Sequence, residues 1–237
     1  MEKKAAADTP MPILDGRLAA AAGMVRSRSR VADIGCDHAL LLCRLGVEGR
    51  LASGLACDKK RGPLERAREN VFRYGLEDII QFRLGDGLGA IGEHEADDIV
   101  ITGMGAETII SILANCPWKI SSGKRLVLSP ATRGEKLRHW LFSNGFNLWE
   151  EKGCLSNGRY YTVMRAGFTG EFKNLDPLDL SCFVGALRHE TCPHDKAVLI
   201  KAYTALQKKA RGLEHSNDPQ SSKHIHAADR ISKLLER

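Results

Sequence analysis

The sequence has no apolar run that approaches the ~18 residues of a membrane-spanning helix, so it predicts no transmembrane segment. Residues 1–16 carry Lys3 and Lys4 but then Asp8 and two prolines, where a signal peptide needs an apolar stretch. Internal repeats and low-complexity tracts are absent too, which leaves a composition typical of a globular protein. We therefore expect a globular, cytoplasmic chain.

Cysteine motifs for pairing or metal binding are also missing. The cysteines form an odd set without a CxxC pair, at the seven positions 36, 43, 57, 116, 154, 182 and 192. We expect free thiols in a reducing compartment, with neither disulfides nor a metal site.

Acidic residues are fewer than basic ones, and the formal net charge of +6 favours a polyanionic partner. A run with arginine at 26, 28 and 30 follows a helix predicted over about 14–25. These arginines either complement the dipole at the end of that helix or contact RNA phosphates.

Strand and helix patterns alternate from residue 31 to about 167. Compact apolar runs predict strands at 31–36, 51–58, 79–86, 98–103 and 125–130. Apolar residues at helical spacing predict helices at 38–45, 62–74, 106–113 and 134–144. This alternation is typical of an α/β protein with a parallel, Rossmann-like sheet covered by helices on both faces.

The end of the chain departs from that alternation. Strands at 146–152 and 159–165 are joined by a connection too short for a crossover helix, so we expect a seven-stranded sheet whose last strand is antiparallel. After Gly170, helical patterns cover 179–189, 195–213 and about 225–235, with a break at Pro193 and a loop at 217–222. We predict a Rossmann-like domain over 1–167 and a helical, coiled-coil-like arm over 168–237.

Ligands of such sheets bind at the C-terminal ends of the strands. The first strand ends near Gly35, which allows a tight turn and a close ligand approach, and the next helix should offer free amides. The GxGxxG dinucleotide fingerprint is absent, because Asp37 and Leu40 stand where its later glycines belong. A carboxylate there favours a ligand with an ammonium or sulfonium group.

The next strand ends extend this pattern. Asp58 is placed to accept hydrogen bonds from ribose hydroxyls, and Asp86, between two glycines, to reach the amino edge of a purine. Gly103 and Gly105 leave space for a ligand, while Met104 can flank a flat ring. An amino-acid end, a ribose and a base are, in this order, the parts of S-adenosylmethionine.

The chain resembles the bacterial tRNA adenine-22 N1-methyltransferases, a family of class I S-adenosylmethionine-dependent enzymes. The similarity runs from about Leu14 to the C-terminus and rests on ADIGCDHALL (32–41), ACDKKRGPLERARENV (56–71), RLGDGL (83–88) and DIVITGMGAETIISIL (98–113). It implies methyl transfer to N1 of adenine 22 of tRNA, and a seven-stranded Rossmann-like domain followed by a helical arm.

The resemblance also implies a role for each matching residue. Cofactor binding falls on Asp33, Gly35, Asp37 and His38 in the first motif, Asp58 and Lys59 at the ribose, Asp86 and Gly87 at the adenine, and Gly103, Met104 and Gly105 beneath the methyl group. Asp37 is in addition our predicted catalytic carboxylate, because the methylated base is cationic.

Two departures from the family concern the substrate. Ala106 replaces a family glycine, and 128–132 replaces an LxxQPN-like segment, so Ser129 and Thr132 would have to hold the target base. Together with Arg133 they are the predicted substrate-binding residues. We also predict a basic lip after this strand, from Arg133, Lys136, Arg138 and His139.

The arm has more basic than acidic residues, counting Arg237 at its end, and we expect it to bind tRNA phosphates, in a monomer or weak dimer. The chain lacks the Asp/Asn-Pro-Pro-aromatic turn of many amino-group methyltransferases, which favours a ring nitrogen as the methyl acceptor. Three alternatives stay open: methylation of another RNA site or of a small molecule, a catalytically silent RNA-binding module, and, weakest, a nicotinamide dehydrogenase.

Overall fold

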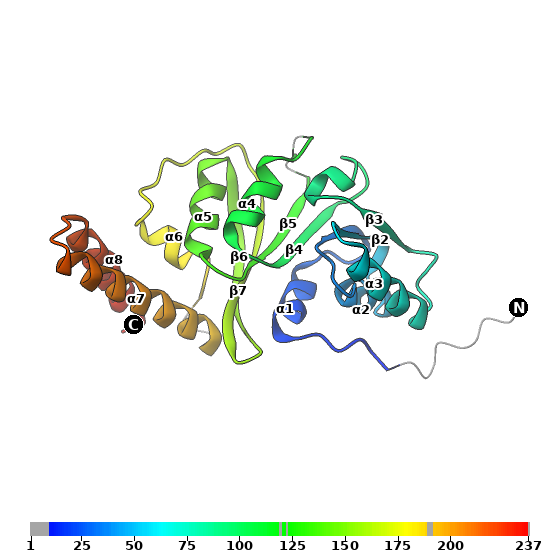
Figure 1. The fold of residues 1–237 in the computed structure, drawn as a ribbon, viewed down its shortest axis with the longest axis horizontal. Helices are drawn as coiled ribbons and strands as arrows, with labels where there is room; N and C mark the ends of the chain where they lie inside the picture. The colour runs from blue at the N-terminus through cyan, green and yellow to red at the C-terminus, as the bar shows by residue number, and fades with distance from the viewer. Residues whose placement is uncertain (1–9, 119, 122, 189–191, 237) are drawn as a thin grey trace, which may run out of the picture.

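A computed structural model of the chain describes residues 10–118, 120–121, 123–188 and 192–236. Its strands form one sheet in the order β3-β2-β1-β4-β5-β7-β6 (Figure 1). Their bounds are Ser29–Ile34 (β1), Leu51–Asp58 (β2), Ile80–Leu84 (β3), Asp98–Met104 (β4), Arg125–Pro130 (β5), Phe146–Ser156 (β6) and Arg159–Phe168 (β7). The predicted seven-stranded Rossmann-like sheet is confirmed.

The first five strands are parallel, and β1 lies between β2 and β4. The strand order reverses at β1, so the connections from β1 and β4 leave the sheet in opposite directions and open a crevice at its C-terminal edge. This edge is where the polar residues predicted for ligand binding come together.

Helices cover both faces of the sheet. One face carries α1 (Gly16–Met24), α2 (Leu40–Val47) and α3 (Arg61–Arg73). The other carries α4 (Ala106–Ala114), α5 (Gly134–Ser143) and the short 3-10 helix η1 (Gly87–Ala90). The central strands are buried from both sides, which explains their almost continuous apolar sequence.

The hairpin β6–β7 is longer than the sequence predicted. Ser156 pairs with Arg159, so only Asn157 and Gly158 form the turn. Both turn residues have positive φ, as a two-residue turn between twisted strands requires. β7 inserts between β5 and β6 and runs antiparallel to both, as expected for the last strand.

The C-terminal segment forms α6 (Leu180–Val184), α7 (Pro193–His215) and α8 (Gln220–Leu235), which share their own apolar core. In Figure 1, α7 and α8 lie side by side and extend away from the sheet. We expected Pro193 to lie in the break between two helices. It is instead the first residue of α7, a position where a backbone N–H would have no partner within the helix. The loop predicted at 217–222 is shorter, because α8 already begins at Gln220.

Gly185 ends α6 against a buried ion pair. Its φ is +57°, and a Cβ there would collide with Glu151 and Arg138. The Arg138 guanidinium donates to both carboxylate oxygens of Glu151 over 2.5–3.1 Å, and the backbone N–H of Ala186 donates to the same carboxylate. α6 is therefore five residues long instead of spanning 179–189; His189 lies outside the described residues.

The ion pair between Arg138 and Glu151 also shows that Arg138 does not belong to an exposed basic lip, as the sequence had predicted. The side chain of Arg138 is 4% exposed and lies inside the fold, where it also donates to the Cys182 carbonyl over 2.9 Å. The His139 ring nitrogen Nε2 lies 3.0 Å from the carbonyl oxygen of Leu175. Only Arg133 and Lys136 of the predicted lip are exposed.

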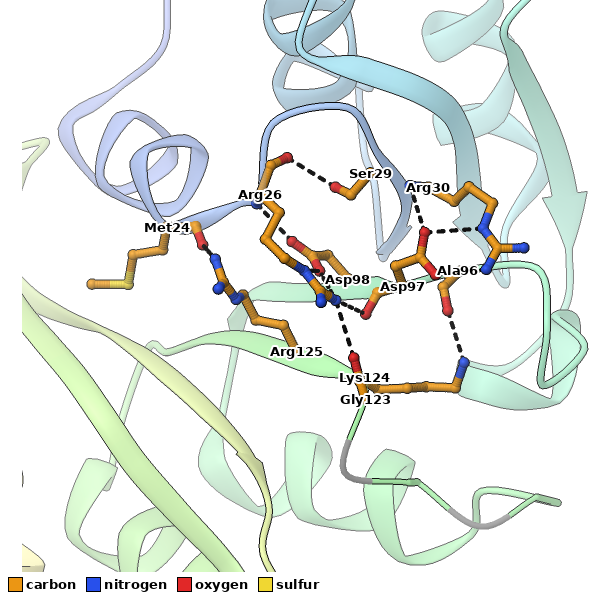
Figure 2. Close-up of polar contacts among 10 residues, drawn as sticks. All are labelled: Met24, Arg26, Ser29, Arg30, Ala96, Asp97, Asp98, Gly123, Lys124 and Arg125. Carbon is orange, nitrogen blue, oxygen red and sulfur yellow. Dashed lines mark hydrogen bonds and ion pairs between the residues drawn. The ribbon is translucent and has the colours of Figure 1, made fainter.

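Two arginines of the basic run at 26–30 pair with acids at the N-terminal edge of the sheet, opposite the crevice (Figure 2). Arg26 donates its side-chain Nε and its backbone N–H to the buried carboxylate of Asp98, over 2.6 and 2.7 Å. Arg30 donates through two guanidinium nitrogens to Asp97, over 2.6 and 2.9 Å. Arg26 and Arg30 thus have structural partners, and the choice between a helix-dipole role and an RNA contact for this run stays open.

Among the described residues, no helix combines the length and apolar character that crossing a membrane requires. Nor does this part of the chain bring three or more His, Cys, Asp or Glu side chains together as a metal site.

Candidate active site

A cavity of 430 Å³ lies at the C-terminal ends of the parallel strands. All residues predicted for cofactor binding line it except Gly105, which instead caps the N-terminus of α4. Several other residues also line the cavity and were not predicted from the sequence, among them Arg17, Lys60, Pro63, Thr102, Thr108 and Ile112. The strand-end rule thus located the cavity, whereas its helical wall was not predicted.

The loop after β1 forms the floor of the cavity. Gly35 has a φ of +74°, and a Cβ there would displace the methyl group of Met104, so this position favours glycine. The backbone N–H groups of Gly35 and Cys36 both donate to the Cys57 carbonyl, over 2.8 and 3.0 Å. These two amides are therefore not free for an anion, and α2 begins only at Leu40 instead of residue 38.

Asp33 is the buried acid of the cavity. It is 4% exposed, and its carboxylate accepts no hydrogen bond from the residues that the structure describes. Burial, followed by repulsion from Asp58 and Asp37, raises its pKa to about 7, against an opposing attraction from Arg17. A cationic ligand group beside Asp33 would relieve this desolvation and repulsion.

Asp37 and His38 lie at the mouth of the cavity. The side chain of Asp37 is 65% exposed, and its φ is +48°. One carboxylate oxygen lies 3.4 Å from Nη2 of Arg66, and the other 3.5 Å from Nε2 of His38. Asp37 therefore holds a negative charge at the rim, where water weakens its electrostatic effect compared with that of Asp33.

The ends of β2 and β3 form the adjoining wall. Asp58 accepts a hydrogen bond from the backbone N–H of Lys60 over 2.9 Å, which orients its carboxylate. Its carbonyl accepts from the N–H of Gly85 over 3.0 Å and so ties Asp86 to the same wall. Both acids line the cavity, as predicted for contacts with a ribose and a base.

The thiols of the cavity are not nucleophiles. Burial raises the pKa of Cys57 to about 12 and also raises the pKa of Cys36, with further repulsion from Asp33. Both remain protonated near neutral pH, which argues against covalent catalysis through a thiolate.

The predicted substrate residues lie outside the cavity lining. Thr132 is exposed beside the end of β4, where its carbonyl accepts from the N–H of Ala106. Arg133 is also exposed and donates to Glu107 over 2.5 Å. Ser129 does not fit the expected contact with a base: it is fully buried, and its hydroxyl donates to the Thr162 carbonyl over 2.8 Å.

Arg17 is the main residue that the sequence analysis missed. It is the second residue of α1, its side chain is 23% exposed, and it lies over the ring of Tyr161 and beside Gly103. The apolar positions of this helix, from which it was predicted, carry no information on Arg17. The position of Arg17 could have indicated a functional role, because a cation in the first turn of a helix is disfavoured by the helix dipole.

Known proteins are similar to this chain in sequence and fold. Residues 14–164 match the family described as methyltransferase domain. The tRNA (adenine(22)-N(1))-methyltransferase of Bacillus subtilis is 32% identical over 192 residues, which cover 81% of this chain and 80% of that protein. The chain belongs to the tRNA (adenine(22)-N(1))-methyltransferase family. The resemblance predicted from the sequence is thereby confirmed.

Solved structures of this family superpose over nearly the whole chain. The B. subtilis m1A22 tRNA methyltransferase TrmK has a TM-score of 0.78 and 27% identity, covering 95% of this chain and 98% of its own. A Streptococcus pneumoniae protein solved in complex with S-adenosyl-L-methionine has a TM-score of 0.76 and 30% identity, covering 91% of this chain and 97% of its own.

The cavity residues fit S-adenosylmethionine on their own chemistry. Asp33 and Asp37 offer negative charge to an ammonium or sulfonium group, and Asp58 offers two acceptor oxygens to a ribose diol. Gly35 and Gly103 also line the cavity, and a Cβ at these positions would collide with Met104 and Arg17 respectively. A diphosphate would be repelled by the same acids, so the family's cofactor suits this chain and a nicotinamide dinucleotide does not.

Proposed function

We propose that this protein methylates N1 of adenine 22 in tRNA with S-adenosylmethionine, as a cytoplasmic enzyme. The observation that carries the proposal is the set of three acids, Asp33, Asp58 and Asp86, from successive strand ends around one cavity in a chain of this family. The acids match an amino-acid group, a ribose and a base in that order.

S-adenosylmethionine supplies the methyl group as a sulfonium electrophile, and adenine N1 accepts it through an in-plane lone pair that carries no proton at neutral pH. The protein therefore has little proton transfer to perform. Its main contribution is alignment of the two reactants, which is worth roughly several kcal/mol. Asp37 stays our predicted catalytic carboxylate, with the role of stabilising the cation that forms on the base.

The target adenine must leave its stack to reach the cavity. Thr132 and Arg133, both exposed after the end of β5, stay the predicted contacts for such a base. The buried Ser129 is withdrawn from this set.

We assign tRNA binding to α7 and α8, which carry the exposed cations Lys201, Lys208, Lys209, Arg211, Lys223, Arg230 and Lys233. Arg237, also counted in the predicted basic arm, lies outside the described residues. Phosphate contacts of this kind carry no sequence information but supply salt-dependent affinity.

The test is methyl transfer to two unmodified tRNA transcripts that differ only in carrying adenine or guanine at position 22. We expect incorporation only into the adenine transcript. The D37N variant should turn over more slowly even at saturating S-adenosylmethionine, because the cation that forms on the base loses a stabilising carboxylate. Equal labelling of both transcripts would instead assign the enzyme to another RNA site.

A further inference from the structure

The tip of the β6–β7 hairpin, residues 155–160, projects from the same edge of the sheet on which the cavity lies. Near the end of β5, Leu128 pairs with Met164 of β7, and the Ser129 hydroxyl donates to the Thr162 carbonyl. Because β7 runs antiparallel to β5, the residues before Thr162 lie past the C-terminal end of β5. Figure 1 shows the hairpin tip between α1 and α7.

Contacts join the hairpin to the cavity on one side and to the basic arm on the other. The Tyr161 ring lies under the guanidinium of Arg17, a residue of the cavity, with 5.7 Å from the guanidinium carbon to the ring centroid. Neighbouring side chains of a strand point to opposite faces, and the Tyr160 ring lies 6.0 Å from the ring of His194 in α7. Lys201 of α7 donates to the Tyr160 carbonyl over 3.2 Å. An RNA held by the arm, with one base in the cavity, would therefore pass over the hairpin tip.

The surface of the hairpin tip is aromatic and cationic. The sequence from Leu155 to Tyr160 contains no acidic residue. Tyr160 is 37% exposed, and Arg159 beside it is exposed and makes no hydrogen bond or ion pair within the described part of the chain. Lys201 is exposed as well, and the carbonyl that it contacts is neutral, so its charge is not cancelled. A flat ring beside uncompensated cations is typical of surfaces that bind unpaired RNA.

Stacking on a base is a contact that the cations of α7 and α8 cannot supply, because they bind phosphates. A target adenine that leaves its stack exposes the faces of the bases next to it. An aromatic side chain near the cavity can cover such a face, and this contact tolerates any base because every base has a π-face.

We propose that the hairpin tip is a second tRNA contact, in which Tyr160 stacks on an unpaired base near the target adenine while Arg159 and Lys201 bind the adjoining phosphates. This proposal rests on the proposed function in taking tRNA as the substrate. It assigns a route for the RNA from the arm to the cavity and gives Tyr160 a role that depends on its ring.

The test compares the double variant R159A/Y160A with a matched control, F72A/R73A. The control also removes an exposed aromatic residue and its exposed arginine neighbour, but in the last turn of α3, which leads back to the N-terminal edge of the sheet. Filter binding would measure tRNA affinity at several salt concentrations, and calorimetry the affinity for S-adenosylmethionine. Steady-state kinetics would separate the KM for tRNA from kcat, and thermal melting would monitor folding.

We expect R159A/Y160A to bind the tRNA transcript roughly 10- to 100-fold more weakly than the wild type, with a KM for tRNA raised to match. The affinity for S-adenosylmethionine should not change, and F72A/R73A should bind both ligands as the wild type does. Y160F keeps the ring and should retain tRNA affinity, whereas Y160A should lose it without a change in salt dependence. R159A should reduce the slope of log affinity against log salt concentration by about 1.

Equal tRNA affinities of R159A/Y160A and F72A/R73A would overturn the proposal. A loss that Y160F shares with Y160A would contradict stacking, and a loss of S-adenosylmethionine affinity in Y160A would make Tyr160 a support of the fold instead. R159A tests the hairpin tip even if Y160A does not fold, because an unchanged salt slope in R159A would contradict phosphate binding there.

The readout separates this proposal from the proposed function. A wild-type protein that methylates no tRNA transcript would contradict the proposed function itself. A wild type that methylates the adenine-22 transcript, with an unimpaired R159A/Y160A variant, would contradict only the role of the hairpin tip.

Discussion

At the scale of single residues, the ionisation of Asp33 sets the balance between cofactor binding and stability. Its pKa is raised to about 7 by burial first and by its acidic neighbours second. Below this pH the carboxyl is neutral, and above it the carboxylate is available to a cationic ligand. The raised pKa thus links proton release to the binding of S-adenosylmethionine.

We predict that the affinity for S-adenosylmethionine rises between pH 6 and pH 8 and then levels off. The D33N variant should bind weakly at every pH with little slope, because its side chain cannot ionise. Calorimetry in two buffers of different ionisation enthalpy would check both the affinity and the proton release. A wild-type affinity that is flat over this range would contradict the assignment of Asp33 to a cationic group.

The raised pKa of Asp33 affects the stability of the free protein in the opposite direction: cofactor affinity should rise with pH, whereas stability should fall. A folded-state pKa above the unfolded value of an acid means that the folded state holds the proton more tightly, so stability falls as pH rises from about 4 through 7. The residue that binds the ligand therefore weakens the fold at neutral pH, which is common at functional sites.

At the scale of elements, the network of Figure 2 joins the loop after α1 to the starts of β1 and β4. Two neighbouring acids contribute unequally to it. Asp98 is fully buried and binds both the backbone and the side chain of Arg26, whereas the side chain of Asp97 is 35% exposed in its ion pair with Arg30. Removing one partner of a buried ion pair destabilises the fold more than removing one partner of an exposed pair, because the remaining buried charge has no partner.

We predict that D98A lowers the free energy of unfolding by about 3 kcal/mol, while D97A lowers it by less than about 1 kcal/mol. Chemical denaturation of both variants at neutral pH would measure the difference. Both should retain cofactor affinity, because the network lies at the opposite edge of the sheet. Equal destabilisation by the two substitutions would show that burial of Asp98 does not govern the network.

Sequence patterns predicted elements well where periodicity is uninterrupted, and less well where tertiary contacts decide. β2 and β5 have their predicted bounds, because each is an apolar run whose end is marked by Asp or Pro. α6 is short because Gly185 turns over the ion pair of Glu151 and Arg138, two residues about 35–50 positions away in the chain. Local patterns contain no information on such a contact.

At the scale of the whole molecule, the cavity and the basic helices lie in different parts of the fold. The predicted domain boundary near residue 168 stays a prediction. Asp195 at the start of α7 accepts hydrogen bonds from Gly153 of β6 and from Arg188, over 2.5 and 2.9 Å, so the beginning of the arm is anchored on the sheet. Deleting the arm would also remove these hydrogen bonds to the sheet, so reversing the charge of exposed residues tests the role of the arm more specifically.

We predict that the double variant K208E/K209E weakens tRNA binding and lowers the salt dependence of the affinity, because two phosphate contacts are lost. Affinity for S-adenosylmethionine should not change. The matched control R61E/R73E reverses two exposed charges of α3, outside the arm, and should bind tRNA nearly as the wild type does. Filter binding at several salt concentrations would compare them, and an equal loss in both would remove the special role of the arm.

The strand ends of the site were predictable because one rule places ligands at the C-terminal edge of a parallel sheet, and Asp33, Asp58 and Asp86 each follow it. Arg17 was not, because it reaches the cavity from a helix before the first strand, and only the packing of α1 brings it there. The buried state of Ser129 depends on β7 lying next to β5, a pairing that the strand patterns alone do not specify.

The most direct test of the central claim is the identity of the methylated nucleoside in a tRNA transcript with adenine 22, compared with one carrying 1-deazaadenine at that position. After incubation with the wild-type protein and S-adenosylmethionine, nucleoside mass spectrometry should find 1-methyladenosine in the first transcript and no methylation of the second. Appearance of N6-methyladenosine, or methylation of the 1-deazaadenine transcript, would contradict transfer to N1 of adenine 22.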